Sequence, residues 1–308
     1  MKGIVYKSTG SWFIVKDNSG KFWNARLKGV MKLDAITSTN PLAVGDEVEI
    51  AVENEKEDTV IVTEIFPRKN YINRQSPRQK HQQHIIASNI DQSILLATLK
   101  SPRTSQGFID RFAVVCEMYH IPLVIVINKS DLHSKKEEDQ FNLLQKMYAA
   151  VGYKVLLTSV NNNAGIEEMK TLLENKISLI SGHSGVGKSS IINLLCPKLN
   201  LKTNEISSWS GKGLHTTTFA EMHELPTSGK IIDTPGMREF GIIGVEKEEL
   251  SHYFPEMRRL LSDCKFNNCL HINEQDCAIK KAVAEDKINI DRYNSYCNIF
   301  DSLDGKKY

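Results

Sequence analysis

Apolar and polar residues alternate over several short stretches within the first 65 positions of the chain. These stretches lie at 12–15, 23–27, 48–52 and 60–65, and the first residues also have the character of a strand. Each stretch has the two-residue period of a strand that is buried on one face. Because turn sequences such as Asp17-Asn18-Ser19-Gly20 separate them, we expect a five-stranded barrel of the OB type over residues 1–68. Such barrels commonly bind oligonucleotides, and the alternative is a barrel that packs against or binds protein.

The pattern changes at about residue 89 to apolar runs that alternate with amphipathic helices. Strands are expected at 94–98, 123–127, 155–158, 177–180 and 230–233, and helices at 108–119, 137–149, 166–174 and 190–195. This alternation is typical of a mainly parallel α/β sheet, which we place at residues 89–244. Beyond Gly244 the chain is charged and helical, so residues 245–308 are expected to form a third domain.

No apolar run approaches the roughly 18 to 20 residues that a membrane span requires. The longest run, at 123–127, has the length of a buried strand, and the N-terminus lacks the apolar core of a signal peptide. We therefore expect no membrane partner, a cytoplasmic location and a monomer.

The formal net charge of +2 says little about partners, but the distribution of charge says more. Between positions 65 and 90 there is no Asp or Glu. The cations of this stretch are Arg68, Lys69, Arg74, Arg78 and Lys80. We interpret residues 69–88 as a basic linker, which either is solvated or contacts a phosphate backbone.

A glycine-rich turn follows the apolar run at 177–180 and precedes the helix expected at 190–195. Its residues are Gly182, His183, Ser184, Gly185, Val186, Gly187, Lys188 and Ser189, followed by Ser190. This strand, loop and helix match a P-loop, in which backbone N–H groups and the helix N-terminus bind phosphates. We expect Lys188 to reach the β- and γ-phosphates and the Ser189 hydroxyl to bind Mg²⁺.

Two further segments have the character of nucleotide switches. The strand at 230–233 ends in Asp233-Thr234-Pro235-Gly236, an Asp-x-x-Gly sequence. In switch proteins this aspartate lies near Mg²⁺ and the glycine amide faces the γ-phosphate. Upstream, the threonines at 216–218 lie where a mobile segment supplies a hydroxyl to Mg²⁺, and Thr217 or Thr218 is the expected ligand.

The identity of the base is expected to be set after the buried run at 123–127. The residues that follow it are Asn128, Lys129, Ser130 and Asp131. The Asp131 carboxylate can accept N1–H and the 2-amino group of guanine, which adenine cannot offer. Asn128 is expected to brace the neighbouring loops, and the Lys129 stem to lie along the base. After the next strand, Ser159 and Val160 occupy the place of the loop whose backbone amide meets guanine O6.

The order of these motifs is the informative feature. The guanine motif and the O6 loop precede the P-loop, which is followed by the threonine switch and Asp-x-x-Gly. In an ordinary small GTPase the P-loop comes first, so the sequence predicts a circularly permuted domain. The permutation is tolerable because each motif lies at its own strand end and domain termini usually lie close together. It also places the second switch directly before the C-terminal domain, which nucleotide hydrolysis is then expected to move.

Three cysteines and one histidine cluster in the C-terminal domain. They are Cys264, Cys269, His271 and Cys277. Disulfides are rare in the cytoplasm, whereas three thiolates and one imidazole complete a tetrahedral site. We therefore expect one structural Zn²⁺ per chain, the alternative being buried cysteines without a metal.

These motifs together resemble the RsgA family, also called YjeQ or YloQ, of ribosome small-subunit-dependent GTPases. The resemblance covers essentially the whole chain, from the barrel through the permuted GTPase motifs to the Cys/His spacing. It implies an OB-fold, a permuted GTPase domain and a zinc-binding helical domain that act in late maturation of the small ribosomal subunit. It also implies contact with rRNA, and hydrolysis of Mg²⁺-bound GTP to GDP stimulated by that subunit.

One position departs from the general GTPase pattern. Met237 follows Gly236, where many GTPases carry the Gln that orients the attacking water. We expect slow intrinsic hydrolysis, with the water oriented by His215 or His223 or by the ribosome. Two other functions remain open: an RNA-binding adaptor that nucleotide merely gates, and an ATP-using enzyme, which Asp131 disfavours.

Overall fold

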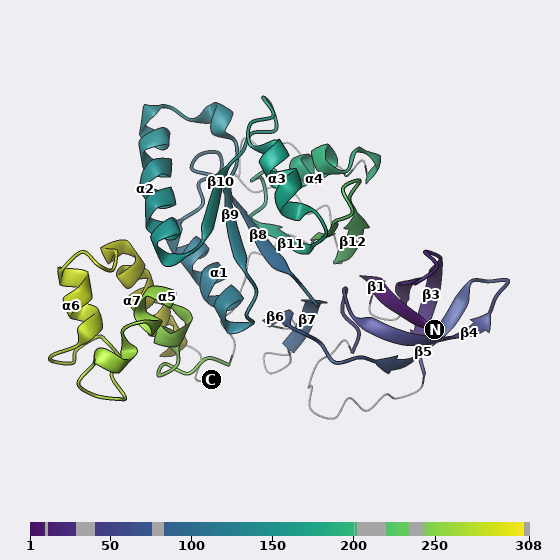
Figure 1. Cartoon of the computed structure of the whole chain (residues 1–308), viewed down its shortest axis with the longest axis horizontal. Helices are drawn as coiled ribbons and strands as arrows, with labels where there is room; N and C mark the ends of the chain where they lie inside the picture. Colours follow the sequence, from purple (N-terminus) through teal and green to yellow (C-terminus); the bar gives the residue numbers. More distant parts are fainter. Residues whose placement is uncertain are drawn as a thin grey trace.

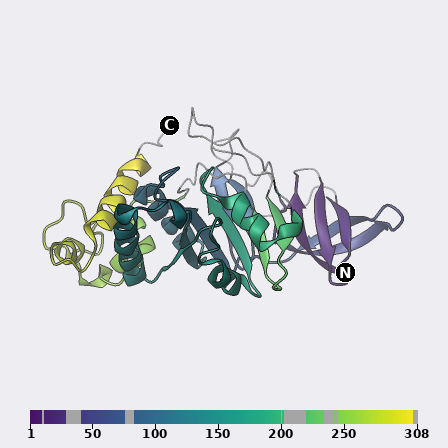
Figure 2. The same ribbon diagram turned by 90° about the horizontal axis from the view of Figure 1, so that it is seen from above.

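The computed structural model describes residues 1–9, 12–28, 41–75, 83–199, 201, 220–233, 242 and 244–304. The molecule is elongated, with a barrel at one end, an α/β domain in the middle and a helical domain at the other end (Figure 1). The view from above shows the same order of domains (Figure 2). The three-part architecture expected from the sequence is confirmed.

Within the described residues, five short strands form the barrel. They are β1 (Lys2–Ser8), β2 (Phe13–Asp17), β3 (Phe22–Leu27), β4 (Glu47–Asn54) and β5 (Thr59–Ile65). They pair in the order β1-β2-β3-β5-β4, and β1 also pairs with β4, which closes the barrel. Alternate residues such as Phe13 and Val15 fill the interior, as the period of two requires. The Asp17 carboxylate accepts from the backbone N–H of Ser19 and the indole of Trp23, which holds the expected turn.

The segment interpreted as a linker contains a hairpin that the sequence analysis did not include. Strands β6 (Tyr71–Gln75) and β7 (Gln83–Ser88) pair antiparallel, and Ala87 also pairs with Val44 beside the barrel. The hairpin therefore connects the barrel to the central domain through backbone hydrogen bonds as well as through the chain.

Arg68, one of the cations of the basic segment, is almost fully buried. Its guanidinium donates to both carboxylate oxygens of Asp46, at 2.6 and 2.7 Å, and Asp46 also accepts from the Ser88 hydroxyl. Asp46 is 0% exposed and Arg68 is 9% exposed, so this pair is part of the interior. Arg68 joins the barrel to the hairpin, and it is neither a solvated residue nor one able to meet a phosphate backbone.

The central sheet is built on the strands expected from the apolar runs. Its strands are β8 (Gln92–Ala97), β9 (Leu123–Ile127), β10 (Lys154–Leu157), β11 (Ile177–Gly182), β12 (Glu221–Glu224) and β13 (Lys230–Asp233). The order is β10-β9-β8-β11-β13-β12, and every neighbouring pair is parallel except β12 with β13. Strand β12 was not expected from the sequence.

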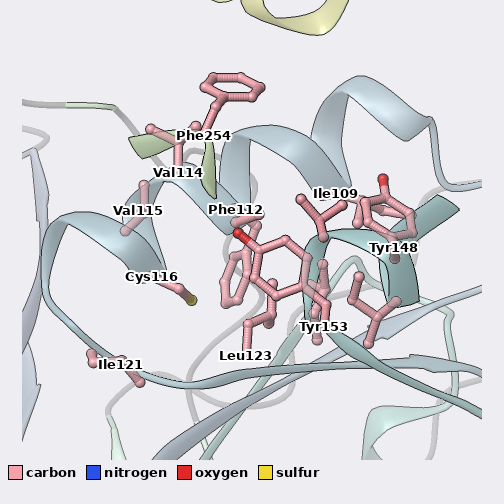
Figure 3. Close-up of a cluster of buried hydrophobic side chains, with 14 of the residues drawn as sticks. Ile109, Phe112, Val114, Val115, Cys116, Ile121, Leu123, Tyr148, Tyr153 and Phe254 are labelled. Carbon is pink, nitrogen blue, oxygen red and sulfur yellow. The ribbon is translucent and has the colours of Figure 1, made fainter. Parts of the chain in front are cut away.

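Helices cover both faces of this sheet because its strands are apolar on both sides. They are α1 (Gln106–Met118), α2 (Lys135–Val151), α3 (Ile166–Leu173) and α4 (Lys188–Leu195). Along β9, Ile125 belongs to the core under α1 and α2, whereas Val124 and Val126 belong to the core under α3 and α4. Figure 3 shows part of the first core, to which Phe112 of α1 and Tyr148 of α2 both belong.

Strand β12 joins the central sheet to the barrel. Glu221 pairs with Lys7 of β1, and the Lys7 ammonium lies 2.8 Å from the Glu221 carboxylate. At the other end of β12, Glu224 accepts from the Tyr6 hydroxyl at 2.8 Å and from Lys16 at 2.5 Å. The hydrogen-bonded sheet therefore runs from the central domain directly into the barrel.

The C-terminal domain consists of short helices that end in one longer helix. They are η3 (Leu250–Tyr253), α5 (Pro255–Arg258), η4 (Leu261–Asp263), α6 (Ala278–Ala284) and α7 (Ile290–Asp304). In the part of the chain that the structure describes, none of the helices is both long and apolar enough to cross a bilayer.

A buried ion-pair cluster attaches this domain to the central one. Arg292 of α7 is 1% exposed and donates to Asp110 of α1 at 2.6 Å and to Glu256 of α5 at 2.7 Å. The Tyr148 hydroxyl donates to the same Asp110 oxygen. Burial alone would lower the pKa of the guanidinium, but the charges of Asp110 and Glu256 outweigh it and raise that pKa. Arg292 is therefore charged, and its ion pairs hold α7 against α1 and α5.

Candidate nucleotide site and metal cluster

The glycine-rich turn lies between β11 and α4, as the sequence predicted. β11 ends at Gly182 and α4 begins at Lys188, so residues 183–187 form the connecting loop. Gly187 has a φ of 95°, and a Cβ at this position would lie 2.4 Å from Nδ2 of Asn128. Only glycine fits this backbone, because any side chain would be both strained and in collision. Val186 is fully buried and anchors the loop in the core under α3 and α4.

The lysine and aspartate expected to bind phosphate and Mg²⁺ lie side by side. The Lys188 ammonium forms an ion pair with the carboxylate of Asp233, which ends β13 and is 1% exposed. Ser189 and Ser190 follow in the first turn of α4, where there is no acidic side chain to compete with an anion. A cation and a carboxylate thus meet where β11 and β13 end, as phosphate and Mg²⁺ binding require, and two serines follow the cation in the chain.

Asn128 connects the P-loop to the guanine motif. It follows β9 and is 1% exposed. Its Nδ2 donates to the carbonyl of Val186 at 2.8 Å, and its Oδ1 accepts from the Thr158 hydroxyl at 3.1 Å. Three loops, which follow β9, β10 and β11, are therefore joined by one side chain. This is the bracing role expected from the sequence, and it brings the base and phosphate loops to the same edge of a parallel sheet.

Asp131 lies in the short turn η1 (Ser130–Leu132), with its side chain exposed. Its Oδ1 accepts from the Ser159 hydroxyl at 2.5 Å, and its Oδ2 accepts from Nδ2 of Asn161 at 2.7 Å. The hydrogen bonds from Ser159 and Asn161 lower the pKa of Asp131, so the carboxylate is ionised at neutral pH. Asn161 was not expected from the sequence, because the loop recognised there included Ser159 but ended at Val160.

The other residues of the guanine loops make contacts within the protein. Lys129 adopts a left-handed φ of 65°, and its ammonium donates to the carbonyl of Ser101 at 2.6 Å. Burial lowers the pKa of this ammonium. The Ser159 N–H donates to Ala164, which folds the loop back on itself, and Val160 within the loop is half-buried. The contact of the Val160 amide with guanine O6 stays a prediction.

A contact with α1 was not anticipated from the sequence. The His183 ring of the P-loop stacks on Phe108, with 3.7 Å between ring centroids and 32° between planes. Phe108 lies in the first turn of α1, within the helix expected at 108–119. The aromatic contact holds the P-loop against the helix that also carries Asp110.

Several expected site residues lie outside the described residues. They are His215, Thr217, Thr218 and Gly236, together with Met237. Their roles in Mg²⁺ binding, γ-phosphate contact and hydrolysis stay predictions.

His223, the other candidate for orienting water, lies on β12. It pairs with Ile231, whereas Glu221 on the same strand pairs with Asp233 at the end of β13. Burial lowers the pKa of its imidazole, so the ring is neutral at pH 7 and able to accept a proton. Its position is set back from Asp233, and its catalytic role stays a prediction.

The four residues expected to bind a metal converge in the C-terminal domain. The ligand atoms of Cys264, Cys269, His271 and Cys277 all lie within 4.8 Å of one another. Nδ1 of His271 lies 3.4 Å from the Cys277 sulfur and 3.6 Å from the Cys264 sulfur, so this nitrogen faces the cluster. The hydroxyl of Tyr293 on α7 donates to the His271 carbonyl and holds the loop in place. Three thiols and one imidazole are a donor set that fits zinc.

Comparison with known proteins supports this description over the whole chain. The family model described as RsgA GTPase matches residues 65–243, and the RsgA N-terminal domain matches residues 2–60. A small ribosomal subunit biogenesis GTPase RsgA from Flavobacterium psychrophilum is 50% identical over 99% of this chain and 94% of its own length. A protein of the same name from Cytophaga hutchinsonii is 50% identical over 97% of each chain.

Solved structures show the same arrangement of domains. The crystal structure of YjeQ from Thermotoga maritima has 32% sequence identity and a TM-score of 0.79, and the match covers 99% of each chain. YloQ, described as a circularly permuted GTPase, has 29% identity and a TM-score of 0.76, covering 100% of this chain and 96% of that one. These matches confirm the permuted order of motifs inferred from the sequence. The chain belongs to the RsgA family of circularly permuted GTPases, and it is a GTP hydrolase.

Proposed function

We propose that this GTPase binds the small ribosomal subunit and hydrolyses GTP during the late maturation of that subunit. The relatives from Flavobacterium psychrophilum and Cytophaga hutchinsonii have small-subunit biogenesis in their names and match nearly the full chain. Under this proposal the protein works in the cytoplasm as a monomer, with GTP, GDP and the small subunit with its rRNA as partners.

The hydrogen bond from Asn128 to the Val186 carbonyl is the observation that carries the nucleotide part of the proposal. It joins the loop that contains Asp131 to the loop that ends at Lys188. One guanine nucleotide can therefore meet Asp131 with its base and Lys188 with its phosphates. The remaining P-loop residues and Val160 then contribute backbone amides along the same ligand.

The proposed Mg²⁺ site consists of the Ser189 hydroxyl, the Asp233 carboxylate acting through water, and a threonine of the first switch, Thr217 or Thr218. The contact between the Lys188 ammonium and the Asp233 carboxylate supports this proposal, because such a cation and carboxylate lie close together where phosphate and Mg²⁺ bind. The Gly236 amide is proposed to contact the γ-phosphate, so loss of that phosphate would release both switches.

We divide the chain into a barrel (1–68), a connecting segment with the hairpin (69–88), the GTPase domain (89–244) and the zinc domain (245–308). The barrel has features that favour an RNA partner. Trp12 is 52% exposed and Phe22 is 48% exposed, and Lys16 lies 5.2 Å from the centre of the Phe22 ring. Exposed aromatic rings beside cations are suited to stacking on unpaired bases. The barrel and the zinc domain are accordingly proposed to contact rRNA.

The fold of the C-terminal domain is proposed to depend on one Zn²⁺ ion. Cys264, Cys269, His271 and Cys277 would hold it, and four protein ligands leave no position for a reacting molecule. The metal would fix the loop between η4 and α6. Tyr293 would then connect that loop to α7, which carries Arg292.

Replacement of Asn128 by Ala tests the link between the loops. The variant would leave the buried carbonyl of Val186 and the Thr158 hydroxyl without this partner. Leaving a buried polar group unsatisfied costs about 1–3 kcal/mol of free energy, and we expect the nucleotide-binding arrangement of the loops to lose a similar amount. Since every 1.4 kcal/mol is tenfold in affinity, we expect GDP to bind roughly 5- to 150-fold more weakly in a titration with fluorescent GDP. Asn24→Ala, on an exposed position of β3, is the control. Unchanged GDP affinity in Asn128→Ala would contradict the shared site.

Single-turnover GTPase rates, with and without ribosomal subunits, test the proposed activity. We expect slow hydrolysis alone and a faster rate with small but not large subunits. If His215 or His223 orients the water, its Ala variant should lose about 100-fold or more of the stimulated rate. His120→Asn, at an exposed position with left-handed backbone, is the control. Stimulated rates that are normal in both variants would assign the role to the ribosome, and absence of stimulation would favour a nucleotide-gated adaptor.

Zinc content and proteolysis test the metal site. We expect one zinc per purified chain, and loss of that zinc in Cys277→Ser with faster proteolysis within residues 245–304. The reason is that structural zinc supplies roughly 10 kcal/mol or more of apparent binding energy to small domains. Cys297→Ser, a cysteine of α7 outside the cluster, should keep its zinc. An unchanged zinc stoichiometry in Cys277→Ser would rule out this ligand set.

A further inference from the structure

Both oxygens of the Asp131 carboxylate already have a donor from the protein itself. The Ser159 hydroxyl lies 2.5 Å from Oδ1, and Nδ2 of Asn161 lies 2.7 Å from Oδ2. The two donors differ in their freedom to move. Ser159 is 0% exposed and also accepts from the backbone N–H of Asn161, whereas the Asn161 side chain is exposed. The Ser159 bond is thus fixed by packing, and the Asn161 amide can turn into solvent.

Guanine requires the same two oxygens that these side chains occupy. Its N1–H and its 2-amino group point in parallel toward a carboxylate in the base plane. Each carboxylate oxygen offers about two lone-pair sites, so Oδ1 can serve Ser159 and one guanine N–H together. The Asn161 amide is different, because it is a planar NH₂ donor of the same kind as the guanine 2-amino group and it approaches Oδ2 at full hydrogen-bond distance.

We propose that Asn161 is a specificity-determining residue of the nucleotide site, whose side-chain amide occupies the acceptor of the guanine 2-amino group until the base displaces it. The inference rests on the proposed guanine site, and it adds to that site a residue that competes with the base. In the nucleotide-free protein, Asn161 keeps the ionised carboxylate of Asp131 aligned. When the guanine 2-amino group binds, loss of the Asn161 hydrogen bond reduces the net free energy gained.

Asn161 should affect the binding of guanine and hypoxanthine nucleotides differently. Hypoxanthine has the N1–H of guanine but lacks the 2-amino group, so inosine diphosphate can bind while Asn161 keeps its bond to Oδ2. Under this proposal guanosine diphosphate breaks that bond, because the planar NH₂ groups of Asn161 and of the base would crowd one another at the same oxygen, whereas the smaller Ser159 hydroxyl leaves room at Oδ1. Asn161 therefore reduces the preference for guanine over hypoxanthine, and its removal should increase that preference.

Equilibrium titrations with GDP, IDP and ADP on the full-length protein and two variants test this inference. In Asn161→Ala we expect GDP to bind more tightly and IDP to bind with nearly unchanged affinity. The ratio of the IDP to the GDP dissociation constant should therefore rise roughly threefold to tenfold, which is the scale of one net hydrogen bond. A residue that merely supports the loop would change the two constants in parallel and leave the ratio unaltered. Asn162→Ala is the matched control, since Asn162 is also exposed and its side chain accepts from the Ala164 N–H without contacting Asp131.

The outcomes separate this inference from the function on which it rests. A wild-type protein that binds ADP as tightly as GDP would overturn the guanine site itself. A wild-type preference for GDP over ADP, with the same IDP-to-GDP ratio in wild type and Asn161→Ala, would overturn only the role of Asn161. An IDP-to-GDP ratio of dissociation constants that is lower in Asn161→Ala than in wild type would also overturn this role, because it would mean that Asn161 assists binding of the 2-amino group.

Discussion

The side chain of Asn128 is the contact on which the nucleotide site depends. An amide has a donor and an acceptor, and here each has a partner in a different loop, the Val186 carbonyl and the Thr158 hydroxyl. Since Asn128 is buried, neither bond is exchanged for water at low cost. The loop that ends at Lys188 and the loops that contain Asp131 and Ser159 are thereby held together at one edge of the sheet.

This constraint is spatial, which explains why the permuted order of motifs is compatible with the site. β9, β10 and β11 are all members of one parallel sheet, so their carboxyl ends meet at one edge in whatever order the chain visits them. The permutation instead determines what is attached to the sheet. β12 pairs with the barrel through Glu221 and Lys7, and the chain beyond β13 leads to the domain that Arg292 fastens to α1. Both accessory domains are therefore connected to strands or helices that border the nucleotide site.

Local patterns were sufficient to predict much of the fold and the core of the site, but contacts between residues far apart in the chain were missed. The apolar run at 123–127 became β9, and the glycine-rich turn lies between β11 and α4, because periodicity and short motifs are contained in a single sequence. Strand β12, by contrast, is only four residues long, and its side chains contact β1 more than 200 positions away. In the sequence Arg68 is one of several cations in a basic segment, and only the fold shows that it pairs with the buried Asp46. Asn161 likewise contacts Asp131 only because two loops converge. Such pairings have no period along the chain, so composition and spacing cannot predict them.

The most direct test of the central claim is the base preference of an Asp131→Asn variant. Xanthine has a carbonyl where guanine has the 2-amino group, so the amide of the substituted side chain would donate to it in place of the lost acceptor. We predict that the variant loses GDP affinity and gains affinity for xanthosine diphosphate, while Lys188 remains needed for binding either nucleotide. If GDP binds equally well to wild type and variant, the base does not meet Asp131, and the two loops do not serve one ligand.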